Sequence, residues 1–366
     1  MSIRTGYSTR ELPAAAADLK EQCGGREPRA VIFFASPKYD PAALSRAMRA
    51  EFPNSCLAGC SSAGELAQCR MMTGSVVAMF LDGDVVEDAA TAVVGNLSSD
   101  ISLKSAFEGL EQHFHMPVAS LDMEKYVGLV MVDGLSGAEE RLLERVGDAC
   151  DLFFVGGSAG DDCKFQATHV LADGQSYRDA AVLVLLRLKH GFQVVKTQSF
   201  LSAGKILTAT KVDEDRRMVL EFDGKPALSA YAEALGVSVA EAPAHFFRHP
   251  LGLMIEGEPF VRSPQHAEGS SIVFYCQIKP GMELEVLQAT DIVSDTRKAI
   301  EQQKSAGAIR GIIDFQCILR TLQLREEQRC GEYGEIFQGI PNIGLSTYGE
   351  AYLGHLNQTS TMLVFR

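Results

Sequence analysis

The chain has 366 residues, and its 34 Lys and Arg stand against 47 Asp and Glu, which gives a formal net charge of −13. Hydrophobic residues make up 46% of the sequence, enough for a full core without disulfide or metal staples. The acidic balance, with no basic run, argues against nucleic acid and against an anionic membrane surface as partners.

The N-terminal residues lack the apolar segment of a secretory signal, and no stretch approaches about 18 apolar residues. The nine cysteines are odd in number and irregularly spaced, as is typical of reduced thiols. The closest pair, Cys56 and Cys60, is better interpreted as buried small side chains than as metal ligands. We therefore expect a cytoplasmic protein.

A strand–helix–strand pattern occurs three times along the chain. In the first unit, the apolar run 31–35 predicts a strand, Asp40 predicts a helix cap, and 55–59 predicts a second strand. In the second unit, Ser136 and Glu139 form the capping-box pattern before a helix. The remaining predicted elements are strands at 126–132, 152–155, 308–315 and 342–345, with a polar helical segment to about 333.

Each unit runs into a glycine motif: Gly59–Glu65, Gly156–Asp161 and Gly344–Glu350. The first glycine of each motif follows the unit's first strand after 28, 29 and 32 residues. This repetition predicts an α/β fold of mixed α+β type. Its β-α-β units carry appended antiparallel strands, and the sheets are layered with flanking helices. The first two pseudo-repeats are expected at about 25–115 and 125–200.

Two interpretations of the glycine motifs stay open. In the structural one, the glycines permit close backbone approach, and Glu65, Asp161 and Glu350 cap neighbouring amides. In the functional one, the loops line a pocket at the carboxyl ends of strands, where open α/β sheets bind ligands. Gly156–Gly160 also matches the Gly-x-Ser-x-Gly nucleophile elbow, with Ser158 as nucleophile, but no helical pattern follows it. A serine hydrolase is therefore a distant third hypothesis, and we expect no enzyme.

Several of these segments resemble the FIST family. The N-terminal half is similar to the FIST N-terminal domain at 57–65, 132–137 and 155–162. The C-terminal half is similar to the FIST C-terminal domain at 223–227, 260–263, 314–320, 344–350 and 355–359. The resemblance spans the chain in order and implies two FIST domains, residues 1–222 and 223–366.

FIST domains are sensory modules that occur with histidine kinases and other signalling outputs. With no output domain in these 366 residues, the chain most resembles the NosP group of haem-binding nitric oxide sensors. The resemblance implies haem b as cofactor, nitric oxide as signal and a partner histidine kinase within a two-component system. Separately, a homodimer is a further expectation. No composition or spacing of the sequence carries the haem function.

A sensor haem needs an axial ligand, usually histidine, beside an open position for the gas. The candidates for that metal ligand are His249, His355 and His190, although a histidine in such a position is more often a solvated or structural residue. The alternative is an apo sensor whose glycine-loop amides and an arginine hold a small metabolite such as an amino acid. The expected ligand-binding residues are Gly59, Ser61, Glu65, Gly156, Gly157, Ser158, Asp161, Arg262, Arg320, Ser346, Tyr348, Glu350 and Asn357.

Overall fold

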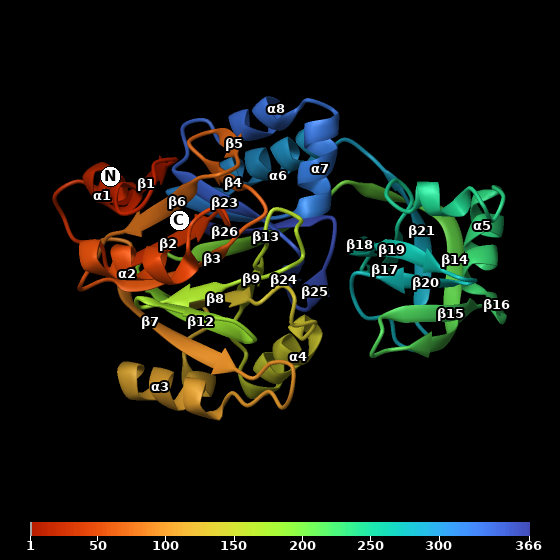
Figure 1. The fold of residues 1–366 in the computed structure, drawn as a ribbon, viewed down its shortest axis with the longest axis horizontal. Helices are drawn as coiled ribbons and strands as arrows, with labels where there is room; N and C mark the ends of the chain where they lie inside the picture. The colour runs from red at the N-terminus through yellow and green to blue at the C-terminus, as the bar shows by residue number, and fades with distance from the viewer. Residues whose placement is uncertain (1) are drawn as a thin grey trace. The chain divides into compact units, whose positions relative to one another are not determined.

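The computed structural model describes residues 2–366, which form two compact units (Figure 1). Unit 1 contains the chain to Lys196, Arg297–His355 and Ser360–Arg366. Unit 2 contains Thr197–Thr296 and Leu356–Thr359.

Three mixed sheets of six strands make up the framework of unit 1. The first has the order β1 (Ile3–Ser8), β6 (Val76–Leu81), β2 (Ala30–Ala35), β3 (Cys56–Ser61), β10 (Val170–Ala172), β11 (Gln175–Tyr177). The second has the order β7 (Val86–Gly95), β12 (Ala180–Leu188), β8 (Tyr126–Val132), β9 (Phe154–Ser158), β24 (Glu350–Tyr352), β25 (His355–Leu356). The third has the order β13 (Phe192–Gln198), β26 (Thr359–Phe365), β22 (Gly311–Cys317), β23 (Asn342–Thr347), β4 (Glu65–Ala67), β5 (Arg70–Met72).

The three sheets follow one plan. Each sheet begins with a leading strand, which is β1, β7 or β13, and beside it lies a closing strand, which is β6, β12 or β26. The closing strand pairs antiparallel with the first strand of a parallel pair. The parallel pairs are β2–β3, β8–β9 and β22–β23. The last two strands of each sheet form a hairpin that comes from another repeat. The hairpin after the first glycine motif joins the third sheet, the one after the second motif joins the first sheet, and the one after the third motif joins the second sheet. The predicted repeated β-α-β units with added antiparallel strands are thereby confirmed.

The helices lie outside these sheets, as predicted. α1 (Ala14–Cys23) and α2 (Pro41–Glu51) pack on the first sheet, and α3 (Lys104–Phe114) and α4 (Glu139–Ala149) pack on the second. The third repeat carries α6 (Ile292–Ala306), α7 (Ile318–Glu326) and α8 (Cys330–Glu335) (Figure 1). Asp40 caps α2 as expected, because its side chain accepts the Ala43 amide at 2.7 Å.

The inner faces of the three sheets share one apolar core. Alternate residues of β2 divide between the two faces: Ile32 and Phe34 point into this core, and Val31 and Phe33 point toward α1 and α2. The rings of Phe34 and Phe315 meet edge-on at 5.7 Å between the first and third sheets. Both faces of β2 are covered, which is why this strand is one continuous hydrophobic run in the sequence.

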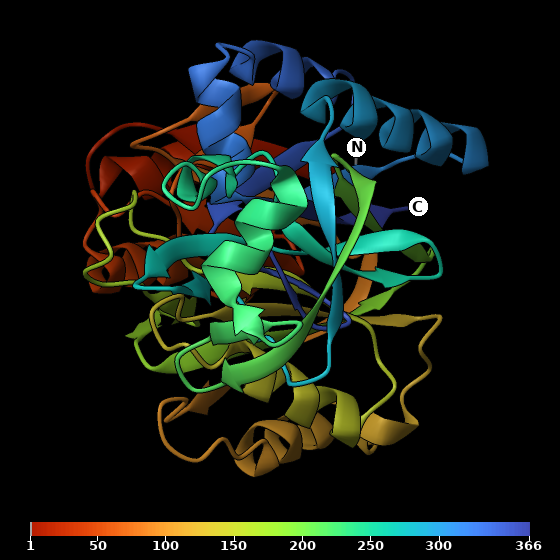
Figure 2. The same ribbon diagram turned by 90° about the vertical axis from the view of Figure 1, so that its right-hand side faces the viewer.

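Unit 2 interrupts the third repeat between β13 and α6. Its sheet runs β18 (Glu258–Arg262), β17 (Leu251–Ile255), β21 (Glu283–Ala289), β14 (Phe200–Asp213), β15 (Met218–Phe222), β20 (Ser271–Phe274), β19 (Pro264–Glu268), with β16 (Lys225–Pro226) on β15. Helix α5 (Ala227–Leu235) lies along this sheet (Figure 2) and ends at Gly236, as predicted.

The strand order also shows where each repeat begins in the sequence. The first two begin with β1 and β7, earlier than the expected 25 and 125, and the third resumes after the insertion. Residues 297–366 therefore lie mostly in unit 1, together with the N-terminal half of the chain.

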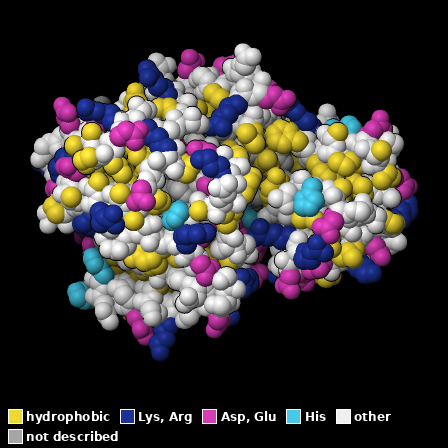
Figure 3. Space-filling view, in the orientation of Figure 1, with side chains coloured by type: hydrophobic (Ala, Val, Ile, Leu, Met, Phe, Trp, Pro, Cys, Tyr) yellow, Lys and Arg dark blue, Asp and Glu magenta, His cyan; other side chains and the backbone are white. Residues whose placement is uncertain are grey.

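Charged side chains of both signs mix on the face drawn in Figure 3, where Lys and Arg lie among Asp and Glu. No helix within residues 2–366 is long and apolar enough to cross a membrane. The nine cysteines are all free thiols, and Cys60 is fully buried, while Cys56 is partly covered.

Candidate functional site

The three glycine motifs meet in unit 1, where the parallel strand pairs end. We call Gly59–Glu65, Gly156–Asp161 and Gly344–Glu350 the glycine junction. The Gly160 amide donates to the Ser61 carbonyl at 3.0 Å, which joins the second motif to the first. The Ser346 amide donates to the Gly64 carbonyl at 2.7 Å, and the Ser158 amide donates to the Gly349 carbonyl at 2.8 Å, so every motif is joined to another.

The first glycine of each motif has the same structural role, which is to allow a neighbouring strand to approach closely. Gly59, Gly156 and Gly344 lie opposite Phe33, Val130 and Asp314 in the three parallel strand pairs. A Cβ atom at these glycines would lie 2.2, 1.8 and 2.6 Å from the carbonyl oxygen of the opposing residue. Only a residue without a side chain allows this approach, so the structural interpretation of these glycines is well supported.

Two motif carboxylates cap polar groups nearby. Glu65 accepts hydrogen bonds from the Ser62 hydroxyl and from the Ser75 amide and hydroxyl. Burial outweighs these bonds and raises the pKa of Glu65 to about 7. Asp161 accepts the amides of 165, 166 and 167 and the hydroxyl of Tyr348. Although burial opposes ionisation, these hydrogen bonds lower the pKa of Asp161.

Other motif side chains make contacts within their own repeat or with another one. The Ser61 hydroxyl accepts the His169 amide at 3.0 Å, and the Ser346 and Thr321 hydroxyls lie 2.8 Å apart. Glu350 is fully buried. The strand glycine Gly157 pairs with Glu350 in the second sheet. The junction thus brings together the expected residues of all three motifs.

A second polar cluster lies beside the junction at the start of α4. The Ser158 hydroxyl donates to Glu139 Oε1 at 2.9 Å, and Nδ1 of His355 lies 3.0 Å from Glu140 Oε1. We call Glu139, Glu140 and His355 the Glu–His cluster. One donor atom from each of the three lies within 4.8 Å of the others. His355 is also packed against the backbone of Gly349, since a Cβ there would lie 1.9 Å from Nε2.

The capping box predicted for α4 is wrong. The helix begins at Glu139 with Ala138 as its cap residue and no side-chain cap, and the Ser136 hydroxyl donates to the Asp133 carbonyl instead. Glu139 is 4% exposed, and its side chain accepts the Ser158 hydroxyl from β9. Glu139 therefore makes a tertiary contact with Ser158 instead of a local cap, and the Ser136–Glu139 spacing alone could not predict this contact.

Ser158 is poorly placed for nucleophilic catalysis. It is 1% exposed, ends β9 and is followed by a loop rather than a helix. Its hydroxyl proton points to a carboxylate, whereas the nucleophile elbow pairs the hydroxyl with an imidazole base. Nothing in this geometry favours the hydrolase hypothesis.

Arg320 and Asp314 form a buried charged group in the third repeat. The Asp314 carboxylate accepts the Tyr333 hydroxyl at 2.9 Å and the Ser360 hydroxyl at 2.6 Å. Burial raises the pKa of Asp314 to about 6, and these hydrogen bonds and the Arg320 guanidinium limit the rise. Arg320 is 2% exposed, and its positive charge lowers the pKa of the Asp314 carboxyl against the effect of burial.

The remaining predicted binding residues lie in unit 2. Arg262 ends β18, and Asn357 is buried with its Oδ1 unpaired. The neighbouring Gln358, which sequence reasoning missed, accepts the Ser263 hydroxyl and donates to the Phe247 carbonyl at 3.0 Å. The structure therefore places Arg262 and Asn357 in the other compact unit from the glycine junction.

The three candidate haem ligands have different surroundings. A carbonyl oxygen accepts hydrogen bonds only, so a ring nitrogen beside one carries the proton. Nδ1 of His249 lies 3.2 Å from the Leu287 carbonyl, which leaves Nε2 with a lone pair. His190 is exposed and uses Nε2 toward the Asp84 carbonyl at 3.0 Å. His355 is enclosed, with Nε2 against Gly349. His249 and His190 thus each have one ring nitrogen beside a backbone carbonyl, whereas Nε2 of His355 lies against the Gly349 backbone.

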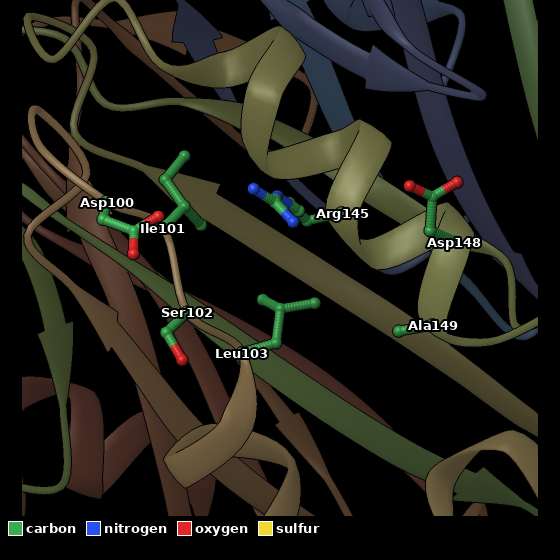
Figure 4. Close-up of a pocket in the computed structure, with 7 residues that line it drawn as sticks. All are labelled: Asp100, Ile101, Ser102, Leu103, Arg145, Asp148 and Ala149. Carbon is green, nitrogen blue, oxygen red and sulfur yellow. The ribbon is translucent and has the colours of Figure 1, made fainter.

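Three open hollows border α3 and α4. The largest, about 430 Å³, lies between α4 and the loop at 100–103, and Arg145 extends from the helix toward Asp100 and Ile101 (Figure 4). An adjoining hollow of about 320 Å³ shares Arg145, and a third of about 370 Å³ lies at the end of α3. None of the three is lined by a candidate haem ligand.

The chain thus contains three β-α-β repeats whose glycine motifs meet at one junction, and a second compact unit is inserted in the third repeat. The chain belongs to the FIST family: residues 29–225 match the FIST N domain and residues 227–352 match the FIST C domain. FIST domains suggest a sensory role in signal transduction with binding of small ligands, and they are not a known enzyme family.

One curated relative is the uncharacterized protein MJ1623 of Methanocaldococcus jannaschii. It is 23% identical over 275 residues, which is 71% of this chain and 53% of the relative. This chain therefore spans about half the length of that relative.

Proposed function

We propose that this protein is a small-molecule sensor whose ligand is haem b, whose signal is nitric oxide and whose output is a partner histidine kinase. The family supports the sensory role. The observation that carries the haem proposal is the hydrogen bond of His249 Nδ1 with the Leu287 carbonyl. This bond fixes the tautomer in which Nε2 can bind iron, as second-shell carbonyls do for metal-ligating histidines.

Other groups in unit 2 suit this proposal. The β17–β18 register places Arg262 opposite Leu251, two residues after His249. A guanidinium on this strand could pair with a haem propionate through charge-assisted hydrogen bonds. The ring of His245 lies 5.8 Å from that of His249 and adds a second imidazole to the same surface.

Within residues 2–366, the contacts at the glycine junction do not favour the amino-acid alternative. The Ser158, Gly160 and Ser346 amides donate to carbonyls of neighbouring motifs. A carboxylate ligand at the junction would have to replace those hydrogen bonds. Arg320 is 2% exposed and its charge acts on the buried Asp314 carboxylate, so fewer donors are available to a ligand than the sequence motifs alone suggest.

Haemin titration of the purified protein and of H249A tests the haem proposal. We expect one equivalent of haemin to give a sharp Soret band in the natural protein. Losing the axial ligand should weaken binding by at least about 10–100-fold, the loss typical of second-shell changes at metal sites. H190A is the matched control, because His190 is exposed and should leave the titration unchanged. Identical broad spectra for all three proteins would contradict the proposal.

A further inference from the structure

The Glu–His cluster joins residues that are far apart in the sequence. Glu139 and Glu140 are the first two residues of α4 in the second repeat, and His355 lies at β25 after the third motif. The His355 and Glu139 side chains are almost fully buried, and the Glu140 side chain is 18% exposed. Solvent therefore reaches the cluster from the Glu140 side.

Carboxylate oxygens and imidazole nitrogens are ligands that divalent first-row metal ions accept. One such atom from each of Glu139, Glu140 and His355 lies within 4.8 Å of the other two.

The distances also suit a metal ion. Two neighbouring ligand atoms of an octahedral ion with bonds of about 2.1 Å lie about 3.0 Å apart. His355 Nδ1 and Glu140 Oε1 are already separated by 3.0 Å. A small side-chain rotation would bring a Glu139 oxygen, now within 4.8 Å, to the same ion. The Ser158 hydroxyl, 2.9 Å from Glu139 Oε1, would orient this carboxylate as second-shell groups do.

We propose that Glu139, Glu140 and His355 form a site for one divalent first-row metal ion, with Nδ1 of His355 as the nitrogen ligand. Two oxygens and one imidazole nitrogen match the preferences of Mn²⁺, Fe²⁺ and Zn²⁺. Three protein ligands leave coordination positions open for water or a small anion. This site lies in unit 1, whereas His249 belongs to unit 2, and the inference does not depend on the haem proposal.

A bound ion would connect the second repeat to the end of the third. Binding to the folded state alone raises stability with ion concentration. The ion therefore links two segments that are 215 residues apart in the chain.

Mn²⁺ is the probe, because it prefers oxygen and nitrogen ligands and avoids the nine thiols. The metal-stripped full chain is titrated with MnCl₂ and followed by electron paramagnetic resonance, in which free Mn²⁺ gives a six-line signal that bound ion loses. We expect one equivalent to bind and the melting temperature to rise by a few degrees, with both effects reversed by EDTA.

Three variants make the test specific. E140Q and H355A should each weaken Mn²⁺ binding by more than about tenfold. E144Q, an exposed glutamate on the same helix, is the matched control and should bind as the natural protein does. E140Q keeps the shape of the side chain, so it remains informative if H355A does not fold. Binding that is absent, or equal in the natural protein, E140Q and E144Q, would overturn the proposal, whatever the haemin titration shows.

Discussion

Alanine at Gly156 is expected to lower the free energy of unfolding by about 4 kcal/mol or more, because it forces apart the parallel strands of the second sheet. The added Cβ would lie 1.8 Å from the Val130 carbonyl oxygen and 2.7 Å from its carbon. Both are backbone atoms inside the sheet, so no side-chain rotation relieves the clash. The interdigitated core on either side resists the movement of more than about 1 Å that would be needed.

Urea denaturation of the natural protein, G156A and G147A measures this effect. Gly147 lies on the exposed face of α4, and an added Cβ there would meet nothing within 4 Å, so G147A should stabilise the protein by about 0.5–1 kcal/mol. If G156A aggregates, its loss from the soluble fraction, with G147A retained, is the same result. A G156A protein within about 1 kcal/mol of the natural one would contradict the close approach of β8 and β9.

Replacing Arg320 by methionine should destabilise the protein by about 3–5 kcal/mol at pH 8, because it leaves the buried Asp314 carboxylate without its cation. The cost should shrink as the pH falls. The pKa of Asp314 is raised to about 6 in the folded protein, above its ordinary value of 3.8. The folded state thus binds the extra proton, and stability falls as pH rises from about 4 to 6. Without the Arg320 charge, the pKa of Asp314 rises further, so the fall in stability continues to higher pH.

Denaturation of the natural protein and R320M at pH 5 and pH 8 tests this expectation. D314N in the R320M background removes the buried charge and should make stability much less dependent on pH. R216M is the matched control, since Arg216 is exposed on unit 2 and should show little change at either pH. An equal loss for R320M at both pH values would mean that the packing of Arg320, rather than its charge, stabilises this region.

Much of unit 1 could be predicted from local patterns. The apolar run at 31–35 became β2, Asp40 became a helix cap, and the similar spacing of the glycine motifs marked the repeat. These features depend on residues within one element or its neighbour. The exchange of hairpins could not be predicted, because the pairing of β4 with β23 joins segments nearly 280 residues apart.

The candidate site was predictable to a lesser degree. The motif residues do meet, yet the partner of Ser158 is Glu139, which sequence reasoning assigned to a helix cap. The adjacent Glu139–Glu140 pair was a usable signal, because the helix starts of the other repeats, Pro41–Ala42 and Ile318–Leu319, carry no acid. Whether His355 reaches this pair depends on β24 and β25 joining the second sheet, which no local pattern encodes.

The absorption spectrum of the haem-loaded, reduced protein before and after nitric oxide tests the proposed function most directly. A sharp Soret band that shifts on addition of the gas, and that H249A does not form, is the predicted result. A broad band like that of free haemin, the same in the natural protein and in H249A, would contradict a haem-based sensor.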